Sequence, residues 1–405
     1  MKIALVNLVT KTIKPIFSLP PYKSKKQFLL DTDRELNIID LGKEFVKSGH
    51  EVTIFISDVF KPKDTIQNEI PGLNVIYIKT HLQAFFIPSR FPFAPEIIKN
   101  VRIEQYDIIL CYDFFELSSI LILLFSKSPS IVIWQELDKF PRFPLNIIHY
   151  LFYHTIGLMC KKNMRLMIPK TQHTRTFMTS LGLESILYAK NIMWGFSNDF
   201  HPGYVRDEYY AKYPINKKTT IILAVARLEE DKGIGNLICA IASLIKTNPN
   251  CYLLIKGDGP LYTQYLNLIK ELKLEQSIMI LKDKISRSEL IKLYQLCDIF
   301  ILPSERDLMP FSIGEAMMTG KPVISTKNAV AEDFIRTNRT GIMIERSDST
   351  LLLNSLQSLI NDSEKFKQLG LNARSTALDN FAINNVANQL ISAFKTIKIP
   401  KNDSK

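Results

Sequence analysis

The sequence predicts an α/β protein of two doubly wound, Rossmann-like domains that face each other across a cleft. Its 405 residues are enough for two domains with a core each. Short apolar segments alternate with segments of helical periodicity in both halves of the chain, and the alternation stops once in between. Strands separated by about one helix imply right-handed βαβ crossovers, and therefore parallel sheets.

The first domain is expected over residues 1–195, where the chain begins with a buried strand. A helix is predicted over 33–48, ending at Gly49, and another over 172–181. The segments predicted as parallel strands are KIALVNLV, HEVTIFIS, NVIYI, DIILCY, SIVIWQE and RLMIPK.

The segment 196–217 loses this periodicity and gains proline, glycine, tyrosine and charge, so we predict a linker there. A second domain is expected over 218–382, with mostly helix after its last strand. Its predicted strands are TTIILAVA, CYLLIKG, SIMILK, DIFILPS and PVIST, and its predicted helices cover 233–246, 260–273, 286–296 and 312–319. A final helix within 383–405 is long enough to cross back to the first domain.

Composition narrows the class of protein. The hydrophobic fraction of 46% and charged fraction of 22% are those of a globular chain. Five scattered cysteines without a close pair favour reduced thiols, and the six histidines show no metal-ligand spacing. The first strand follows Met1 without the features of a signal peptide, and the longest apolar run, LSSILILLF, falls short of the roughly 20 residues that span a bilayer. We expect a cytoplasmic protein.

The net charge of +11 indicates either an anionic partner or a solvated basic face. The basic residues form no dense stripe interleaved with aromatics, so we expect no nucleic acid partner. A membrane surface, a phosphorylated ligand or a lysine-rich solvated face each accounts for the balance. Two aromatic segments with basic residues, 81–95 and 146–165, are compatible with contact with a membrane surface, and the alternative for the second is an ordinary core helix with a cationic end.

Two cations follow the first strand of the second domain. In AVARLEEDKG, Arg227 and Lys232 lie in the turn between that strand and a helix. Cations beside a helix N-terminus suit a di-anion such as a diphosphate; a surface salt bridge to Glu229, Glu230 or Asp231 is the alternative. The tight turn IKGDGP, which contains Gly257, follows the next strand and lies at the same edge of the sheet.

Two carboxylates lie near the end of another strand at this edge. In PSERDLMPFSIGEAMMTGKPVIS, Asp307 precedes a predicted helix and Glu315 lies in its first turns, with seven residues between the two acids. A carboxylate there is favoured by the helix dipole and can accept hydrogen bonds from both hydroxyls of a ribose. Asp307 could accept from hydroxyls of the group that the diphosphate carries. The alternative is that Glu315 caps the helix and Asp307 is a solvated loop acid.

The same stretch resembles the EX7E motif of retaining glycosyltransferases with the GT-B fold, of the GT4 type, whose pattern is PSxxEGFPxxxxEAMAxGxPVI. AVARLEEDKG resembles the family's GRLxxxKG, IKGDGP its GxGP turn, and GFSNDFHP its linker pattern GVDxxxFxP. The resemblance covers most of residues 190–345. In the first domain it rests on KSGHEVTIF and the strand order.

The resemblance implies a nucleoside-diphosphate sugar donor bound by the second domain, with the turn of Gly257 as part of the donor site. Arg227 and Lys232 would neutralise the leaving diphosphate, Glu315 would hold the ribose, and Asp307 the sugar hydroxyls. The loop near 282–285 would contact the base. The family typically needs no divalent metal, so no cofactor is expected. The acceptor would be a glycan or a lipid-linked molecule, in the synthesis of cell-surface polysaccharide or glycolipid at the cytoplasmic face of the membrane.

The sequence departs from the family pattern in both domains. Asp307 stands where the family has glutamate, and Glu305 could take its place at the sugar; Leu308 replaces a glycine. In the first domain, Gln135 and Glu136 stand where the family often carries a histidine.

Acidic residues at the strand ends of the first domain, Asp113, Glu136 and Asp138, are the candidates for contacts with the acceptor. The departures keep two other interpretations open. One is a non-catalytic GT-B protein that serves as a partner subunit, and the other is a nucleotide-sugar epimerase of the same architecture.

Overall fold

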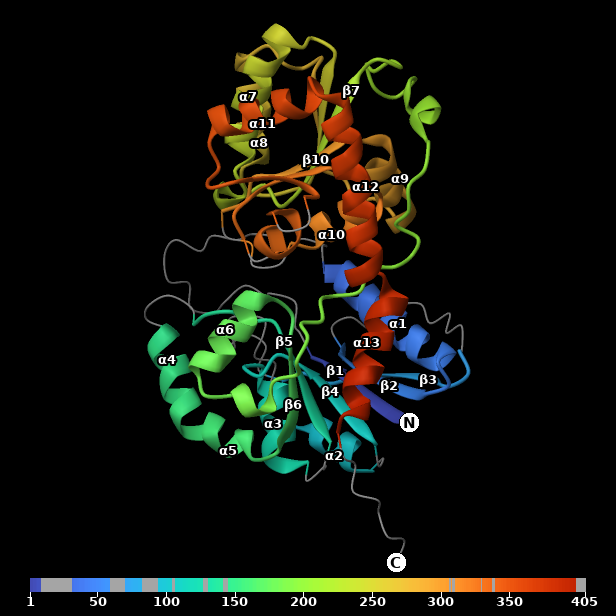
Figure 1. The fold of residues 1–405 in the computed structure, drawn as a ribbon, viewed down its shortest axis with the longest axis vertical. Helices are drawn as coiled ribbons and strands as arrows, with labels where there is room; N and C mark the ends of the chain where they lie inside the picture. The colour runs from blue at the N-terminus through green and yellow to red at the C-terminus, as the bar shows by residue number, and fades with distance from the viewer. Residues whose placement is uncertain are drawn as a thin grey trace, which may run out of the picture. The chain divides into compact units, whose positions relative to one another are not determined.

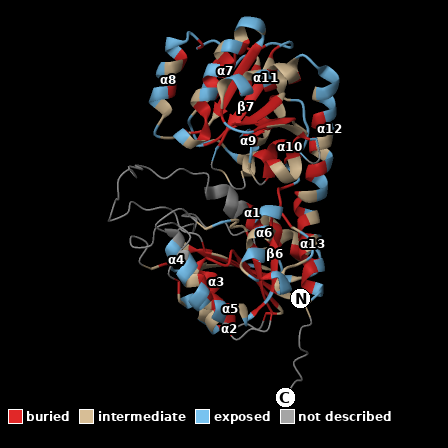
Figure 2. Cartoon of the chain, turned by 60° about the vertical axis from the view of Figure 1, so that its left-hand side comes forward, coloured by how far each residue is buried: buried red, intermediate tan, exposed pale blue. Residues whose placement is uncertain are grey.

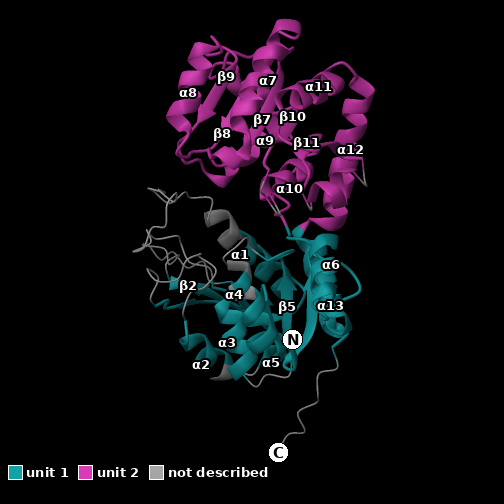
Figure 3. Ribbon diagram, turned by 90° about the vertical axis from the view of Figure 1, so that its left-hand side faces the viewer, with its two compact units in different colours: residues 1–195, 383–405 teal, residues 196–382 magenta. Residues whose placement is uncertain are grey.

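The structure, a computed structural model of the chain, divides into two compact units, which Figure 3 distinguishes by colour. One unit comprises Met1–Gly195 with Ile383–Lys405, and the other Phe196–Ala382. The residues that the structure describes are 1–8, 31–58, 70–81, 94–103, 106–126, 130–140, 145–305, 307, 310–328, 330–336 and 339–397.

The first unit is built on a six-stranded sheet in the order β3-β2-β1-β4-β5-β6, in which every pairing is parallel (Figure 1). Its strands are β1 (Lys2–Asn7), β2 (Glu51–Ser57), β3 (Leu73–Ile78), β4 (Ile108–Tyr112), β5 (Ile131–Gln135) and β6 (Met164–Pro169). Its helices are α1 (Asp31–Lys47), α2 (Glu96–Ile103), α3 (Leu117–Phe125), α4 (Leu145–Phe152), η2 (Tyr153–Gly157), α5 (Leu158–Lys161), α6 (Gln172–Ser180), η3 (Glu184–Ile186) and α13 (Ile383–Lys395). The continuous apolar runs become strands buried on both faces, as parallel sheets require.

The second unit repeats this plan with the sheet order β12-β11-β10-β7-β8-β9, again parallel throughout. Its strands are β7 (Thr220–Val225), β8 (Cys251–Lys256), β9 (Ile278–Leu281), β10 (Ile299–Leu302), β11 (Val323–Thr326) and β12 (Gly341–Ile344). Its helices are η4 (Arg206–Tyr209), η5 (Glu230–Lys232), α7 (Ile234–Thr247), α8 (Tyr262–Glu271), α9 (Arg287–Leu296), α10 (Phe311–Met318), η6 (Ala331–Arg336), α11 (Ser349–Ile360) and α12 (Ser363–Asn380). The predicted pair of doubly wound α/β domains is confirmed.

One strand was missed. The chain after PVIST was expected to be mostly helical, but β12 pairs in parallel with β11 before the helices begin. Gly341 lets the two backbones meet, since a Cβ there would lie 1.9 Å from the oxygen of Val323. Four residues, GIMI, are too few to show a strand period.

The segment 196–217, predicted as a linker, is part of the second unit. Arg206 in η4 donates to Asp298 at 2.6 Å and to the carbonyl oxygen of Thr219, which ties the segment to the sheet. The final helix, α13, is part of the first unit, where Phe394 contacts Phe45 with ring centroids 6.0 Å apart.

Burial follows the two sheets, whose strands are mostly red in Figure 2. All five cysteines are free thiols. Within the described part of the chain, no helix is both long and apolar enough to cross a lipid bilayer.

Candidate active site

The predicted site residues of the second unit come from the loops after three adjacent strands. In the sheet order, β10, β7 and β8 are neighbours, so their carboxyl ends meet at one edge. Arg227 and Lys232 follow β7, Gly257 follows β8, and Asp307 and Glu315 follow β10. Ligands of open parallel sheets bind at this kind of edge.

Lys232 is a buried cation whose side chain reaches the loop after β10. It is 4% exposed, and its Nζ lies 2.6 Å from Oδ1 of Asp307 and 3.4 Å from Oδ2 of Asp231. It also donates to Oγ of Ser304 at 3.5 Å. The sequence therefore predicted correctly that the two loops meet, but Asp231, offered as an alternative partner, is part of the same cluster. A buried ammonium needs such partners because desolvation disfavours its charge.

The turn that presents Lys232 depends on Gly233. This residue has φ +66°, and a Cβ on it would lie 2.2 Å from Oγ of Ser347 and 2.3 Å from the carbonyl oxygen of Pro303. Gly233 is the C-cap of η5 and the N-cap of α7. Its left-handed conformation therefore turns the chain between the two helices, directly after Lys232.

Arg227 is separate from this cluster. Its guanidinium forms an ion pair with Glu229 at 3.0 Å, and the two side chains are 46% and 30% exposed. This is the surface pair that the sequence offered as the alternative. Exposed pairs contribute little to stability, so an incoming anion can replace Glu229 at small cost.

Glu315 is a buried carboxylate in the same unit. It is the fifth residue of α10, is 6% exposed, and its Oε2 accepts a hydrogen bond of 2.6 Å from the hydroxyl of Tyr294. The N-cap of α10 is Pro310, so the interpretation of Glu315 as a helix cap is wrong. Tyr294 had no signal in the sequence because it lies on α9, a different helix.

The two acids before α10 differ in position. The carboxylate that meets Lys232 belongs to Asp307, whereas Glu305 is exposed and donates through its backbone N–H to the oxygen of Asp231 at 2.8 Å. The expectation about Leu308 lies outside the described residues.

Gly257 holds the ends of β7 and β8 together. A Cβ on Gly257 would lie 1.9 Å from the carbonyl oxygen of Ala226. Beside it, the N–H of Ala226 donates to the oxygen of Lys256, and that of Leu228 donates to the oxygen of Asp258. The loops that carry the site residues are therefore joined through their backbones.

We expect Gly257→Ala to lower the free energy of unfolding by about 1–3 kcal/mol, because the backbone of Ala226 must move away from the new methyl group. Chemical denaturation of the variant measures the loss. Gly235→Ala is the matched control, since its Cβ would meet only Cε1 of Tyr265, at 3.5 Å, and alanine favours the helix by up to about 1 kcal/mol. Equal destabilisation by both substitutions would contradict this role of Gly257.

In the first unit, Asp113 and Gln135 are used to hold two loops at the carboxyl edge of the sheet. Gln135 is fully buried, accepts from the N–H of Phe114 at 2.8 Å and donates to Oδ1 of Asp113 at 3.0 Å. Asp113 has φ +59° and also accepts from the backbone N–H groups of Phe115 and Leu137.

Glu136 pairs with a lysine that the sequence did not single out. Its Oε2 lies 3.2 Å from Nζ of Lys170, which is 1% exposed and lies 3.4 Å from the ring centre of Trp194. Asp138, two residues further along the same loop, has a buried oxygen, Oδ1, without a hydrogen-bond partner, and burial raises the pKa of its carboxyl group. Of the three acids proposed for acceptor contacts, Asp138 thus has unused hydrogen-bonding capacity.

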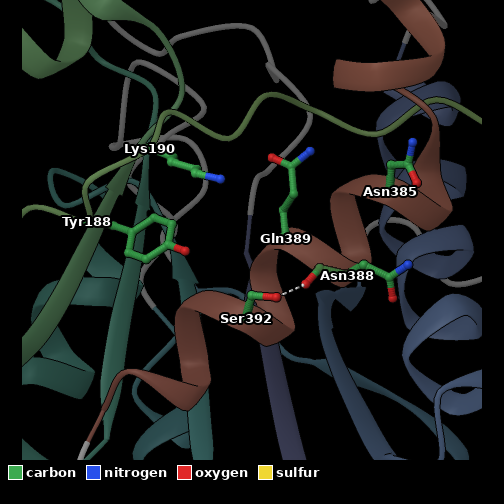
Figure 4. Close-up of a pocket in the computed structure, with 6 residues that line it drawn as sticks. All are labelled: Tyr188, Lys190, Asn385, Asn388, Gln389 and Ser392. Carbon is green, nitrogen blue, oxygen red and sulfur yellow. Dashed lines mark hydrogen bonds between the residues drawn. The ribbon is translucent and has the colours of Figure 1, made fainter.

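A small hollow of about 230 Å³ lies elsewhere in the first unit, between α13 and the segment after η3 (Figure 4). Its lining is polar, and Oγ of Ser392 donates to the carbonyl oxygen of Asn388 at 2.8 Å. It includes none of the predicted site residues. Within the described residues, no cluster of three or more histidine, cysteine or acidic side chains could hold a metal ion.

Part of the chain is similar in sequence to known proteins. Residues 205–376, which include the loops after β7, β8 and β10, match the family described as glycosyl transferases group 1. The chain is 26% identical over 186 residues to an N-acetyl-alpha-D-glucosaminyl L-malate synthase of Bacillus anthracis, covering 46% of this chain and 47% of that protein. The chain spans about half the length of the curated relatives it matches first.

Solved structures resemble the whole chain. A glycosyltransferase of Rickettsia africae matches with a TM-score of 0.70 at 20% identity, covering 99% of both chains. Anabaena Alr3699/HepE, in complex with UDP and glucose, matches with a TM-score of 0.69 at 18% identity, covering 98% of this chain and all of that one. These likenesses show the GT-B fold of two Rossmann-like domains.

Proposed function

We propose that the chain is a retaining glycosyltransferase, because residues 205–376 match the family described as glycosyl transferases group 1. It would move a sugar from a nucleoside-diphosphate sugar to an acceptor. The observation that carries the proposal is the buried Lys232, held by Asp307 at the carboxyl edge of the second sheet.

Lys232 and Arg227 act on the leaving group in this proposal. Negative charge builds up on the diphosphate as the glycosidic bond breaks, and cations already placed beside it stabilise that transition state more than the ground state. The β-phosphate would take the position that Asp307 holds at Nζ of Lys232, and the freed carboxylate would accept from sugar hydroxyls. The guanidinium of Arg227 would exchange Glu229 for a phosphate oxygen.

Glu315 selects the nucleoside part of the donor. The hydrogen bond from Tyr294 fixes the orientation of its carboxylate, which can then accept from the ribose hydroxyls. The two cations supply the positive charge that a divalent metal would otherwise bring, so we propose catalysis without a metal cofactor. HepE was solved with UDP and glucose, which makes UDP-sugars the first donors to test.

The acceptor is proposed to be a glycan or a lipid-linked molecule, met at the inner face of a membrane during synthesis of cell-surface polysaccharide or glycolipid. Asp138 supports an acceptor site in the first unit, since its buried Oδ1 has no partner and an acceptor hydroxyl could donate to it. The raised pKa of this carboxyl group also fits a group that exchanges a proton with a hydroxyl.

One observation favours a non-catalytic partner subunit instead. Gln135, which stands where the family often has a histidine, is fully buried and bound to Asp113, so it is not available to a substrate. In that case the second unit would retain nucleotide binding without sugar transfer.

Donor binding tests the proposal through thermal stability. We expect one family of nucleotide sugars, tested among UDP-, GDP-, ADP- and dTDP-sugars with EDTA present, to raise the melting temperature. A ligand at a hundredfold excess over its Kd stabilises the folded state by about 2.7 kcal/mol. The absence of a shift with every nucleotide sugar would contradict a donor site, while a shift without any sugar release would favour the non-catalytic subunit.

A further inference from the structure

The helical segment Leu145–Lys161, formed by α4, η2 and α5, exposes large apolar side chains that a folded chain normally buries. It runs along the outside of the first unit, with α5 beside α3 in Figure 1, and exposed residues along it are pale blue in Figure 2. The exposed fractions reach 57% for Leu151 and 62% for Met159. The exposed apolar residues of this ridge are Ile147, Tyr150, Leu151, Ile156, Leu158 and Met159.

The ridge is firmly attached by its inner face. Tyr153, Gly157 and Cys160 are buried, and Tyr153 and Phe114 have ring centroids 6.4 Å apart. A Cβ on Gly157 would lie 3.1 Å from the ring of Tyr153, one turn earlier in the same segment, and 3.5 Å from the ring of Phe114, so glycine leaves room for both rings. The apolar exposure of the outer face is therefore a property of the folded unit.

The sequence on both sides of the ridge carries positive charge alone. The sequence has no acidic residue between Asp138 and Glu184. Lys162 and Arg165 are exposed directly after the ridge, while Lys161 donates to the carbonyl oxygen of Gly182 at 2.7 Å. Apolar side chains bordered by cations match a surface that is apolar below and anionic above.

We propose that this ridge docks the protein on a lipid bilayer rich in anionic headgroups, with the apolar side chains entering the boundary between headgroups and acyl chains. The inference deepens the proposed function, on which it rests for a lipid-linked acceptor, by naming the surface that brings the site to such an acceptor. The charge argues for lipid over a second copy of the chain, because two identical ridges would face each other with like charges.

Vesicle co-sedimentation of the full chain tests the docking. We expect binding to vesicles of equal parts phosphatidylcholine and phosphatidylglycerol, weaker binding to phosphatidylcholine alone, and weaker binding in high salt. The double variant Leu151→Gln/Met159→Gln should lower the partition onto the anionic vesicles by about tenfold or more, since it removes two apolar side chains from the contact. Lys162→Gln should reduce the preference for anionic vesicles.

The matched control is Leu266→Gln/Leu371→Gln, which changes two apolar side chains that are 40% and 59% exposed in the other unit. It should leave vesicle binding unchanged, and both double variants should keep the melting temperature shift with the donor. Unchanged binding of the ridge variant, or equal loss in the control, would overturn the proposal. So would a dimer in sedimentation equilibrium that the ridge variant dissociates, which would identify the ridge as a protein interface. Donor binding, measured without vesicles, stands or falls separately.

Discussion

Replacing Lys232 by alanine is expected to lower the rate of sugar transfer by about 10²–10³-fold, which is the effect of removing one preorganised charge-stabilising donor from an active site. The ammonium is 4% exposed, and it lies 2.6 Å from a carboxylate that a phosphate would replace. Buried charge acts more strongly than exposed charge because water screens it less. Initial rates of nucleoside diphosphate release, with saturating donor, measure the loss in kcat.

Lys292→Ala is the matched control for Lys232→Ala. Lys292 forms an ion pair with Glu208 at the same Nζ–oxygen distance of 2.6 Å, but that pair lies on the surface. The Lys292→Ala variant should retain full activity. Lys232→Gln keeps most of the side-chain stem and guards against simple unfolding, and its melting temperature should stay close to that of the parent. A wild-type rate in either Lys232 variant would contradict the role given to this residue.

Replacing Glu315 by glutamine is expected to weaken nucleotide binding by about 10–100-fold, because a hydrogen bond to a charged group contributes about 1.5–3 kcal/mol. The amide can still accept the hydrogen bond from Tyr294, so the packing of α9 and α10 should persist. Isothermal titration with the nucleoside diphosphate alone, without sugar, isolates the contribution of this end of the donor.

The variant Tyr294→Phe distinguishes nucleotide binding by Glu315 from the structural support that Tyr294 gives to Glu315. It removes the hydroxyl that orients Glu315 and should cost about 1 kcal/mol of stability, with a smaller loss of nucleotide affinity than Glu315→Gln. If Glu315→Gln binds nucleotide as tightly as the parent while its stability falls, Glu315 is a structural residue and the ribose must be held elsewhere.

The fold could be predicted because each sheet is built from apolar runs buried on both faces, and such runs are visible in any window of sequence. β5, IVIWQ, is buried throughout, and its run of apolar residues could therefore be recognised as a strand in the sequence. β12 is different, since its four residues lie at the edge of the sheet and three of them are only partly buried. Its place is set by close approach of the backbone at Gly341, a contact that no local pattern records.

The residues of the candidate site also include some that could be predicted from the sequence and some that could not. Lys232 and Asp307 were predictable because the loops after adjacent parallel strands lie at one edge of a sheet, and the structure joins the two side chains. Lys170 and Glu136 also follow adjacent strands, β6 and β5, but no motif in the sequence marked this lysine. Tyr294 could not be predicted, because a tyrosine inside α9 has no local feature that marks a buried partner on α10.

The central claim is that the second unit binds a nucleoside-diphosphate sugar and that Lys232 helps to break its glycosidic bond. The most direct measurement is release of nucleoside diphosphate by the purified full chain from a panel of nucleotide sugars in EDTA, alongside Lys232→Ala. The account predicts slow release from one family of donors, with EDTA present, and its loss in the variant. No release from any donor, or the same release from the variant, would contradict it.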